Sequence, residues 1–380
     1  MSEARPLFET PADAVRHCGP EAPVLCFSPE TLRETAETFR HGFPGLVTYA
    51  VKANPDPAII DNLAAAGIRA FDVASLPEIE MIRSRVPGAV LHYNNPVRAA
   101  YEIERAVALG VRSFSLDSAG ELDRLTPRVA PGTELTVRFK LDVKGAAYDF
   151  GAKFGAEPPE ATRLLAEVAR RGFTPSLTFH PGTQCAPPEV WHAYVAEAGR
   201  IAATAGVRLA RLNVGGGFPA HRHTGPRPAL DPIFETIRTE ANRAFSPGAR
   251  PALVCEPGRG LVAESCTLLT RVRALRGTDI FLNDGIYGGL AEMLTLPMTD
   301  RIEVVAANGL PRCGAPIPVT LFGPTCDSLD RLPGTPALPG DIAEGDAVLF
   351  RGLGAYSGVT ATRFNGFGAL HVTTVRRLTA

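Results

Sequence analysis

Eight short apolar segments, separated by helix-like stretches, dominate the first two thirds of the sequence. Each segment is rich in β-branched and aromatic residues, which is typical of a buried strand. The segments lie at residues 46–53, 70–75, 90–95, 113–118, 134–140, 175–180, 211–215 and 252–256. Between them Ala and Leu recur at helical spacing, and several of these stretches end in Gly, as helices commonly do.

This alternation predicts parallel strands connected by helices, an arrangement found in two architectures. One is a closed (β/α)8, or TIM, barrel, and the other is a doubly wound open sheet. The eight units favour the barrel, and so does the lack of a Gly-rich phosphate loop after the first strand. We therefore predict an α/β fold whose main domain is an N-terminal (β/α)8 TIM barrel spanning residues 26–265.

The pattern changes after about residue 265. β-branched residues, Pro and Gly become frequent, and strand-like runs occur at Thr267–Arg273, Ile317–Phe322, Ala347–Phe350 and His371–Val375. These runs predict a C-terminal all-β domain of residues 266–380, which residues 1–25 are expected to join. Leu332–Gly340 is rich in Pro and Gly and is predicted to be a surface turn or loop.

The charge and cysteine content argue against several classes of protein. With 39 Lys and Arg against 40 Asp and Glu, the formal net charge is -1, so we expect neither a nucleic-acid nor an anionic-membrane partner. No apolar run is long enough to span a bilayer, and Met1–Pro11 lacks the pattern of a signal peptide. The seven cysteines are dispersed and form no Cys-x-x-Cys pair, which favours reduced thiols in a cytoplasmic protein.

One lysine, Lys52, ends the first predicted barrel strand in the run Tyr49-Ala50-Val51-Lys52-Ala53-Asn54. An ammonium group in an apolar strand is unfavourable unless it is paired or neutral. Burial lowers the pKa of a lysine, and a neutral amine is a nucleophile toward carbonyls. Lys52 is therefore either a strand-end lysine whose ammonium group reaches solvent or a lysine that forms a Schiff base.

Other polar residues also follow the predicted strands, at the rim where barrels of this kind have their active sites. They are Asp72, Asn94, Asp117, Arg138, His180, Gly215-Gly216-Gly217 and Glu256. Each of them, taken alone, is compatible with a solvated loop, and His180 with a hydrogen-bonded core residue. Their occurrence together predicts a polar pocket at the carboxyl ends of the strands.

The last two strand ends have the composition of a phosphate site. Gly215-Gly216-Gly217 follows the seventh strand, and Glu256-Pro257-Gly258-Arg259 follows the eighth. Glycines let backbone N–H groups approach a phosphate at these positions, and an arginine adds a planar charged donor. A lysine, a phosphate cradle and a carboxylate on one rim have a joint explanation in pyridoxal 5'-phosphate. A lysine holds this cofactor as an imine, and a carboxylate keeps its ring nitrogen protonated.

These residues and several further motifs resemble the fold type III (alanine-racemase-fold) pyridoxal-phosphate decarboxylases, the ornithine/diaminopimelate/arginine decarboxylase family. The resemblance spans nearly the whole chain. Its motifs are Tyr49-Ala50-Val51-Lys52-Ala53-Asn54, Phe71-Asp72-Val73-Ala74-Ser75, Lys153-Phe154-Gly155, His180-Pro181-Gly182-Thr183, Gly215-Gly216-Gly217-Phe218-Pro219, Glu256-Pro257-Gly258-Arg259, Asn283-Asp284-Gly285-Ile286-Tyr287-Gly288, Gly323-Pro324-Thr325-Cys326-Asp327-Ser328-Leu329-Asp330 and Gly354-Ala355-Tyr356.

The resemblance implies a role for each matching residue. Lys52 would form the Schiff base, His180 would stack on the cofactor ring, and Glu256 would pair with the pyridine nitrogen. Asp72 and Arg138 would lie near the ring and the lysine. The phosphate would be held by Thr183, Gly215, Gly216, Gly217, Gly258, Arg259 and Tyr356.

Two residues of the predicted β-domain would act on the substrate. The resemblance implies that Cys326 protonates the carbanionic carbon after carbon dioxide leaves, and that Asp327 binds the distal ammonium group of the substrate. In this family both residues serve the neighbouring subunit, so a homodimer with shared active sites is implied. A thiol is a competent proton donor near neutral pH. Without the motif, Cys326 would be interpreted as a buried inert cysteine and Asp327 as a capping residue.

The run Cys326-Asp327-Ser328 resembles the ornithine and lysine branch, whereas the diaminopimelate branch would carry Cys-Glu-Ser. We therefore expect decarboxylation of L-ornithine to putrescine and CO2, as in polyamine biosynthesis, with lysine or another diamino acid as the alternative. Animal-type ornithine decarboxylases carry a Tyr-Asp pair that also binds the substrate amine. Ungapped counting places Thr295 and Leu296 there, which leaves the choice of basic amino acid open.

Two other functions remain as alternatives. An amino-acid racemase of the same fold would use a tyrosine as the opposing base and an arginine at the pyridine nitrogen, where this chain has Glu256. A non-catalytic regulatory homologue would be expected to lack cofactor or dimer residues, which this chain retains. His221-Arg222-His223 contains two histidines in a polar loop that is predicted to be solvated, so we expect no metal ion there.

Overall fold

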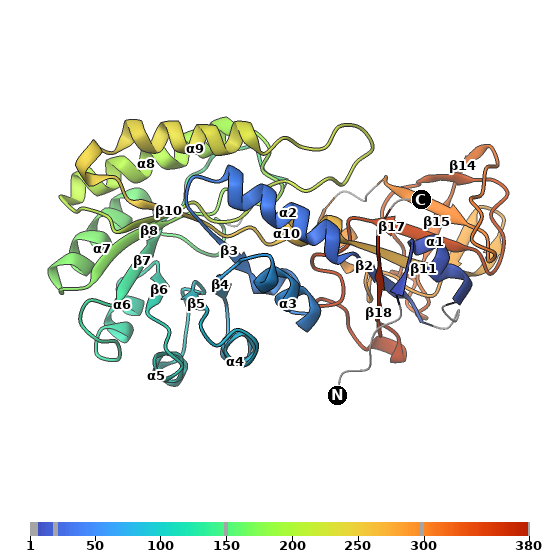
Figure 1. The fold of residues 1–380 in the computed structure, drawn as a ribbon, viewed down its shortest axis with the longest axis horizontal. Helices are drawn as coiled ribbons and strands as arrows, with labels where there is room; N and C mark the ends of the chain where they lie inside the picture. The colour runs from blue at the N-terminus through green and yellow to red at the C-terminus, as the bar shows by residue number, and fades with distance from the viewer. Residues whose placement is uncertain (1–6, 18–21, 148–150, 297–299, 379–380) are drawn as a thin grey trace. The chain divides into compact units, whose positions relative to one another are not determined.

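The computed structural model of the chain describes residues 7–17, 22–147, 151–296 and 300–378. These residues form two compact units, which Figure 1 shows as ribbons. One unit comprises the described residues of Ala36–Pro219 and Pro228–Gly260, and the other comprises those of Met1–Thr35, Ala220–Arg227 and Leu261–Ala380. The predicted domain boundaries at residues 26 and 265 stay a prediction.

The first unit is built on a closed barrel of parallel strands in the order β10-β3-β4-β5-β6-β7-β8-β9. The strands are β3 (Leu46–Ala50), β4 (Ala70–Val73), β5 (Val90–Tyr93), β6 (Ser113–Leu116), β7 (Glu134–Arg138), β8 (Thr174–Thr178), β9 (Arg211–Asn213) and β10 (Ala252–Cys255). The predicted TIM barrel is confirmed over the open sheet. All eight observed strands end before the predicted ones, so most of the polar rim residues lie in the loops that follow.

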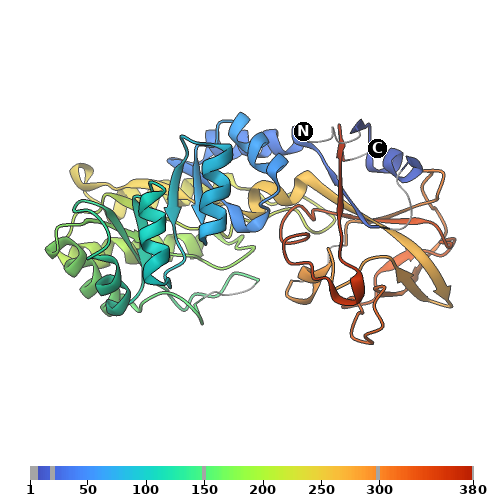
Figure 2. The ribbon, with the colours of Figure 1, turned by 90° about the horizontal axis from the view of Figure 1, so that it is seen from below.

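Helices connect the strands and cover the outside of the barrel (Figures 1 and 2). They are α2 (Pro29–Gly42), α3 (Pro57–Ala65), α4 (Leu76–Arg85), α5 (Ala100–Ala108), α6 (Ala119–Leu125), α7 (Pro158–Arg170), α8 (Pro188–Ala205), α9 (Asp231–Ala244) and the short α10 (Arg259–Val262). Side chains of Asp56, Ser75 and Ser118 cap α3, α4 and α6 by accepting hydrogen bonds from first-turn backbone N–H groups. Trp191 of α8 stacks on Phe218 with 4.5 Å between ring centroids, which packs a helix against the barrel rim.

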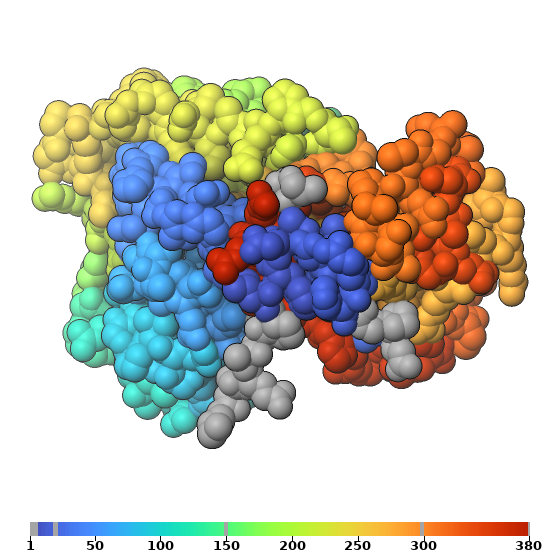
Figure 3. All heavy atoms as spheres, turned by 45° about the vertical axis from the view of Figure 1, so that its right-hand side comes forward, coloured from blue at the N-terminus to red at the C-terminus, as the bar shows by residue number. Residues whose placement is uncertain are grey.

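The second unit is rich in β-structure, as predicted for its C-terminal part, but residues 1–25 also contribute the short helix α1 (Pro11–His17). Its main sheet has the order β1-β18-β2-β11-β12-β15, and β17 joins β11 to β13. The strands are β1 (Leu7–Phe8), β2 (Val24–Phe27), β11 (Cys266–Arg276), β12 (Asp279–Leu282), β13 (Ile302–Val305), β15 (Thr320–Phe322), β17 (Ala347–Arg351) and β18 (His371–Val375). Both ends of the chain meet here, since β18 pairs with β1 and β2, and Figure 3 shows the N-terminal segment beside red C-terminal residues.

Three local predictions in this unit need correction. The run Ile317–Phe322 is split between β14 (Pro316–Pro318) and β15, which belong to different sheets, because Pro318 cannot donate to a continuing ladder. The predicted surface loop Leu332–Gly340 contains β16 (Ala337–Pro339), which pairs with β14. The loop of His221-Arg222-His223 is not uniformly solvated, because Arg222 is buried and forms a 3.0 Å ion pair with Glu292.

None of the helices in the described part of the chain combines the length and the apolar character that a bilayer crossing requires. Within the same residues, no group of three His, Cys, Asp or Glu side chains is arranged to hold a metal ion.

Candidate active site

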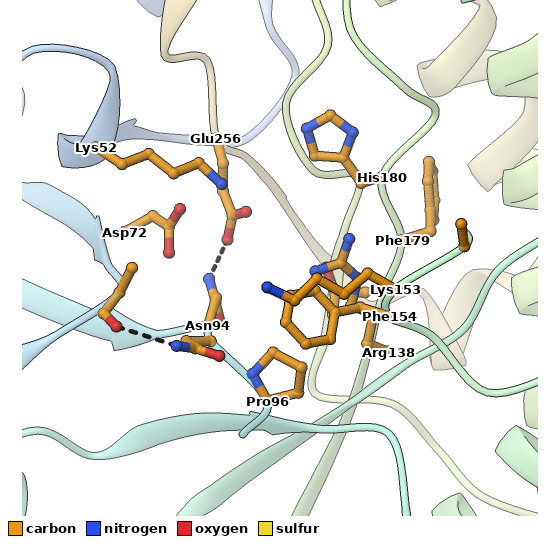
Figure 4. A pocket seen from close by; sticks show the side chains of 14 residues that line it. Lys52, Asp72, Asn94, Pro96, Arg138, Lys153, Phe154, Phe179, His180 and Glu256 are labelled. Carbon is orange, nitrogen blue, oxygen red and sulfur yellow. Dashed lines mark hydrogen bonds between the residues drawn. The ribbon is translucent and has the colours of Figure 1, made fainter. Parts of the chain in front are cut away.

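A cavity of about 440 Å³ lies at the carboxyl ends of the barrel strands. Figure 4 shows charged side chains from separate strand ends gathered around it. The lining residues are Lys52, Asp72, Ala74, Asn94, Asn95, Pro96, Arg138, Ala152, Lys153, Phe154, Thr178, Phe179, His180 and Glu256. The predicted polar pocket is therefore present, and five of the proposed site residues line it: Lys52, Asp72, Arg138, His180 and Glu256.

Lys52 does not lie in a strand, as the sequence suggested, but in a 3₁₀ turn, η1 (Val51–Ala53), directly after β3. Val51 and Ala53 are buried on either side of it, and Lys52 itself is exposed. Figure 4 shows its side chain extending toward Glu256, in the lining of the cavity. The turn is closed by the backbone N–H of Asn54, which donates to the carbonyl of Val51 at 3.1 Å. The amine is thus presented to the cavity.

Two carboxyl groups lie buried in the lining, Asp72 in β4 and Glu256 just after β10. Burial raises the pKa of Glu256 to about 8, and the charge of Asp72 adds to this effect. Burial also raises the pKa of Asp72, while Lys52, a hydrogen bond from Asn94 and Arg138 oppose the rise. A cation placed in the cavity would stabilise the ionised forms of these two carboxyl groups, which are both hard to ionise without it.

His180 and Arg138 supply the other polar groups of the lining. Nδ1 of His180 accepts a 3.1 Å hydrogen bond from the backbone N–H of Gly182, so this ring nitrogen carries no proton. Burial, with Lys52 and Arg138 nearby, lowers the pKa of His180 well below its ordinary value, so the ring is neutral at physiological pH. The guanidinium of Arg138 lies 5.4 Å from the ring centre of Phe154. A neutral imidazole can stack on a flat aromatic ligand.

The glycine triplet forms a tight surface beside His180. Gly215 has φ +70°, and a Cβ there would lie 2.1 Å from the carbonyl oxygen of Phe179. A Cβ on Gly216 would lie 2.8 Å from the carbonyl oxygen of Glu256, and one on Gly217 would lie 2.2 Å from the carbonyl oxygen of Gly182. These contacts leave no room for a side chain at any of the three positions.

Three further residues of the predicted phosphate site lie in the same unit. Nε of Arg259 donates to Oγ1 of Thr183 at 3.4 Å, which links the loops after β8 and β10. A Cβ on Gly258 would lie 2.9 Å from Cβ of Ala53, so this glycine lets the second loop pack on the turn that carries Lys52. A guanidinium, a hydroxyl and closely approaching glycine backbones are a donor set that suits a phosphate group.

Cys326, Asp327 and Tyr356 belong to the other unit and do not line this cavity. Cys326 is exposed, which contradicts its interpretation as a buried inert cysteine, and its Sγ donates to Oδ1 of Asn365 at 3.2 Å. Asp327 accepts a hydrogen bond from the hydroxyl of Tyr287. Tyr356 has φ +53°, a conformation that few non-glycine residues adopt.

Several side chains at the site could not be given a role from the sequence. Asn213 ends β9 immediately before the glycine triplet and donates to Glu256, and Asn94 was recognised as a rim residue but given no role. Glu78 of α4 is mostly enclosed, and burial raises its pKa to about 7. The strand-end rule that selected Glu256 applies equally to Asn213, whose uncharged amide drew less attention.

The barrel, the lysine-bearing cavity and its phosphate-type cradle define a pyridoxal-phosphate enzyme. Residues 30–263 match the family model of the pyridoxal-dependent decarboxylases, described as their pyridoxal binding domain. The chain belongs to this family and is a pyridoxal-phosphate-dependent decarboxylase, a carbon–carbon lyase. The family expected from the sequence motifs is thereby confirmed, in preference to the racemase.

Two relatives and one solved structure illustrate the similarity. The lysine/ornithine decarboxylase of Selenomonas ruminantium is 33% identical over 355 residues, which cover 91% of this chain and 87% of that protein. The ornithine decarboxylase of Mus musculus is 31% identical over 347 residues, covering 84% and 73%. A lysine/ornithine decarboxylase from Vibrio vulnificus, solved with cadaverine, is 26% identical with a TM-score of 0.80, covering 94% of this chain and 95% of that one.

Proposed function

We propose that this enzyme decarboxylates a basic L-amino acid, with L-ornithine, which yields putrescine and CO2, as the preferred substrate and L-lysine as the alternative. The observation that carries the choice of a basic substrate is Asp327, a carboxylate held by Tyr287 one residue from the exposed thiol of Cys326. A fixed carboxylate favours a substrate with a second, distal ammonium group and disfavours one without it. The named activities of the relatives agree with this substrate class.

The residues of the barrel cavity fit the cofactor. Lys52 would hold it through the amine, His180 would lie against its ring, and Glu256 would face its ring nitrogen. Asp72 would balance the charge of Lys52, and Arg138 would balance the charges of Asp72 and Glu256. The phosphate would be held by Thr183, Gly215, Gly216, Gly217, Gly258, Arg259 and Tyr356. When bound, pyridoxal 5'-phosphate supplies a ring that accepts the electron pair released as CO2 leaves.

The remaining steps fall to side chains of the β-rich unit. Sγ of Cys326 would deliver a proton to the carbon that has lost CO2, and its hydrogen bond to Asn365 supports a fixed thiol position. Asp327 would bind the distal ammonium group. Ungapped counting puts Thr295 and the buried Leu296 where animal-type ornithine decarboxylases have a second carboxylate, so we propose that Asp327 alone recognises the ammonium group.

We further propose a homodimer in which Cys326 and Asp327 serve the partner's barrel cavity. A complementation experiment tests this arrangement. Lys52→Ala and Cys326→Ala chains, each inactive by itself, are mixed under dissociating conditions and returned to assay buffer. Shared sites predict recovered activity, because one of the two mixed sites has both intact residues. Activity that stays absent, in mixtures shown to contain the mixed dimer, would contradict shared sites.

The substrate is tested with a panel of L-ornithine, L-lysine, L-arginine and meso-diaminopimelate, measured by CO2 release. We expect turnover to be highest with L-ornithine and measurable with L-lysine. Lys52→Ala should abolish both this turnover and the visible absorbance of the bound cofactor. No turnover on any basic L-amino acid would contradict the proposal. A preference for meso-diaminopimelate would mean that this amino acid, and not L-ornithine, is the substrate.

Putrescine formation would place the enzyme in polyamine biosynthesis, and we propose that this takes place in the cytoplasm. None of the six described cysteines, Cys26, Cys185, Cys255, Cys266, Cys313 and Cys326, is joined in a disulfide, which agrees with a reducing compartment. Cell fractionation with an antibody to the chain tests the location, and polyamine levels in a deletion strain test the pathway.

A further inference from the structure

Glu256 accepts two side-chain amide hydrogen bonds on a single oxygen. Nδ2 of Asn94, which follows β5, and Nδ2 of Asn213, the last residue of β9, both donate to Oε1 of Glu256. Figure 4 shows the bond from Asn94 inside the cavity. The two amides therefore approach the carboxyl group from two different strand ends, and both bonds go to Oε1 rather than to Oε2.

The direction of the bond from Asn213 follows from the neighbouring backbone. Oδ1 of Asn213 accepts a 2.9 Å hydrogen bond from the backbone N–H of Gly215. A backbone N–H group only donates, so the atom that faces Gly215 is the oxygen and the NH₂ group faces Glu256. An NH₂ group also only donates, so Oε1 of Glu256 acts as an acceptor and carries no proton.

The electrostatic environment of Glu256 explains why these hydrogen-bond donors matter for its ionisation. Burial and the charge of Asp72 favour the protonated form of Glu256, and they raise its pKa to about 8. The hydrogen bond from Asn213 and the charges of Lys52 and Arg138 act in the opposite direction. Without the amide donors the pKa of Glu256 would rise further, and the carboxyl group would ionise less readily beside a cation in the cavity. A neutral acid cannot balance a cation in the cavity.

We propose that Asn94 and Asn213 are positioning residues for Glu256, which orient its carboxyl group, favour its ionised form and leave Oε2 to meet the cationic ring nitrogen of the cofactor. This inference rests on the proposed role of Glu256 at that nitrogen. Asn94 has a second effect, because its hydrogen bond to Asp72 also favours the ionised form of that neighbour. The two neutral amides thus favour the ionised forms of two neighbouring buried carboxyl groups, Asp72 and Glu256.

A binding experiment on the full-length apoenzyme tests this role without measuring activity. The probes are pyridoxal 5'-phosphate and its 1-deaza analogue, in which the ring nitrogen is replaced by a C–H group. The quantity of interest is the preference, defined as the Kd of the analogue divided by the Kd of pyridoxal 5'-phosphate. Both probes carry the aldehyde and the phosphate, so damage to the lysine or the phosphate cradle changes both Kd values equally.

We expect the wild-type enzyme to prefer pyridoxal 5'-phosphate and Glu256→Gln to lose that preference. Asn94→Leu and Asn213→Leu should each lower the preference about tenfold, as expected for a lost hydrogen bond to a charged group. Asn213→Leu also removes the acceptor for Gly215, and that effect appears in both Kd values. In the Glu256→Gln background, Asn94→Leu should leave the preference unchanged, because the carboxylate it acts on is gone.

The matched control is Asn62→Leu on α3, whose amide donates only to the carbonyl of Ala58 in its own helix and which should keep the wild-type preference. If the Asn94 and Asn213 variants keep the preference while Glu256→Gln loses it, the inference is overturned and the proposed role of Glu256 stands. A loss of affinity that is equal for both probes also overturns it, since that marks a structural role. If Glu256→Gln keeps the preference, both the proposed role of Glu256 and the inference about the two asparagines are wrong. Should a leucine variant not fold, Asn94→Ala removes the same donor with less added apolar bulk.

Discussion

The hydroxyl group of Tyr287 donates a 2.5 Å hydrogen bond to Oδ2 of Asp327. The other oxygen of this carboxylate accepts a 2.9 Å bond from the backbone N–H of Leu329. Both bonds favour the charged form and lower the pKa of Asp327, with the contribution of Tyr287 the larger. Tyr287 packs on the ring of Phe364, with 4.9 Å between ring centroids. The proposed ammonium-binding group is therefore oriented by its own unit before any substrate arrives.

Replacing Tyr287 by phenylalanine should weaken substrate recognition without blocking the chemistry. The change keeps the aromatic packing and removes one hydrogen bond to a charged group, so we expect KM for L-ornithine to rise about three- to tenfold at nearly constant kcat. Steady-state kinetics measure both constants. Tyr101→Phe, on the exposed face of α5, is the control and should resemble wild type. A Tyr287→Phe enzyme with an unchanged KM would argue against the role given to Asp327.

The glycine triplet offers a second prediction, based on a matched pair of glycines. Gly215 and Gly132 have similar backbone angles, with φ +70° and +78°, but only Gly215 has a carbonyl oxygen in the path of a Cβ. Gly132→Ala should lower the free energy of unfolding by about 1 kcal/mol through backbone strain alone. Gly215→Ala adds a clash, so we expect a loss of about 3 kcal/mol or more. It should also weaken cofactor binding.

Urea denaturation gives the two unfolding free energies, and fluorescence titration gives the Kd for pyridoxal 5'-phosphate. If the two alanine variants were equally stable and bound the cofactor equally well, the close approach at Gly215 would have no functional meaning.

The residues that the sequence allowed us to bring together are those governed by a general rule of barrels. Polar residues at the carboxyl ends of barrel strands converge whatever their distance along the chain. The sequence alone therefore allowed us to group five residues: Lys52, Asp72, Arg138, His180 and Glu256. The rule is less informative about local backbone. It did not reveal that Lys52 sits in a 3₁₀ turn, because a single turn has no periodicity to detect.

Pairings between distant residues account for most of what the sequence could not reveal. The amide of Asn94 meets Glu256 across 162 positions of sequence, and only the closed barrel sets that register. Arg222 is buried because Glu292 compensates its charge, and neither residue carries a local sign of the other. Strand patterns in the β-rich unit failed at Pro318 for the opposite reason, since a local backbone restriction interrupts an apolar run.

A buried ion pair next to β5 and β6 yields a third prediction. The side chains of Arg98 and Glu121 are 0% and 3% exposed and lie 3.0 Å apart, and Arg98 also donates to the carbonyl oxygens of Tyr93 and Ser115. Arg98→Met removes these donors and leaves the buried Glu121 with Arg124 as its remaining ion-pair partner among the residues that the structure describes. We expect the free energy of unfolding to fall by about 3 kcal/mol or more. Equilibrium denaturation in urea measures the change.

An exposed pair on the same barrel serves as the control for this measurement. Arg105 and Glu80 are 55% and 49% exposed, so Arg105→Met should change the unfolding free energy by less than about 1 kcal/mol. Adding Glu121→Met to Arg98→Met should recover part of the lost stability, because the buried charge is then removed. A double variant as unstable as the sum of both single variants would show that packing, not charge, dominates at this position.

The last prediction concerns His92, which lies buried inside the barrel on β5. Its Nε2 is 3.1 Å from Nη1 of Arg211. A guanidinium only donates, so this nitrogen is an acceptor and the ring is neutral. Burial, with the nearby charge of Arg211, lowers the pKa of His92 to about 3, from an ordinary value of 6.5.

The sign of the pH effect follows from this lowered pKa. Below pH 6.5 His92 is protonated in the unfolded chain, whereas in the folded chain it stays neutral down to about pH 3. Its contribution to stability is therefore complete above pH 6.5 and is progressively lost as the pH falls toward 3. Between pH 7.5 and pH 5 this loss amounts to about 2 kcal/mol. His92→Gln should remove that part of the pH dependence in urea denaturation, whereas His41→Gln, exposed on α2, should keep it. Equal pH dependence in both variants would mean that His92 takes up its proton in the folded enzyme as readily as in the unfolded chain.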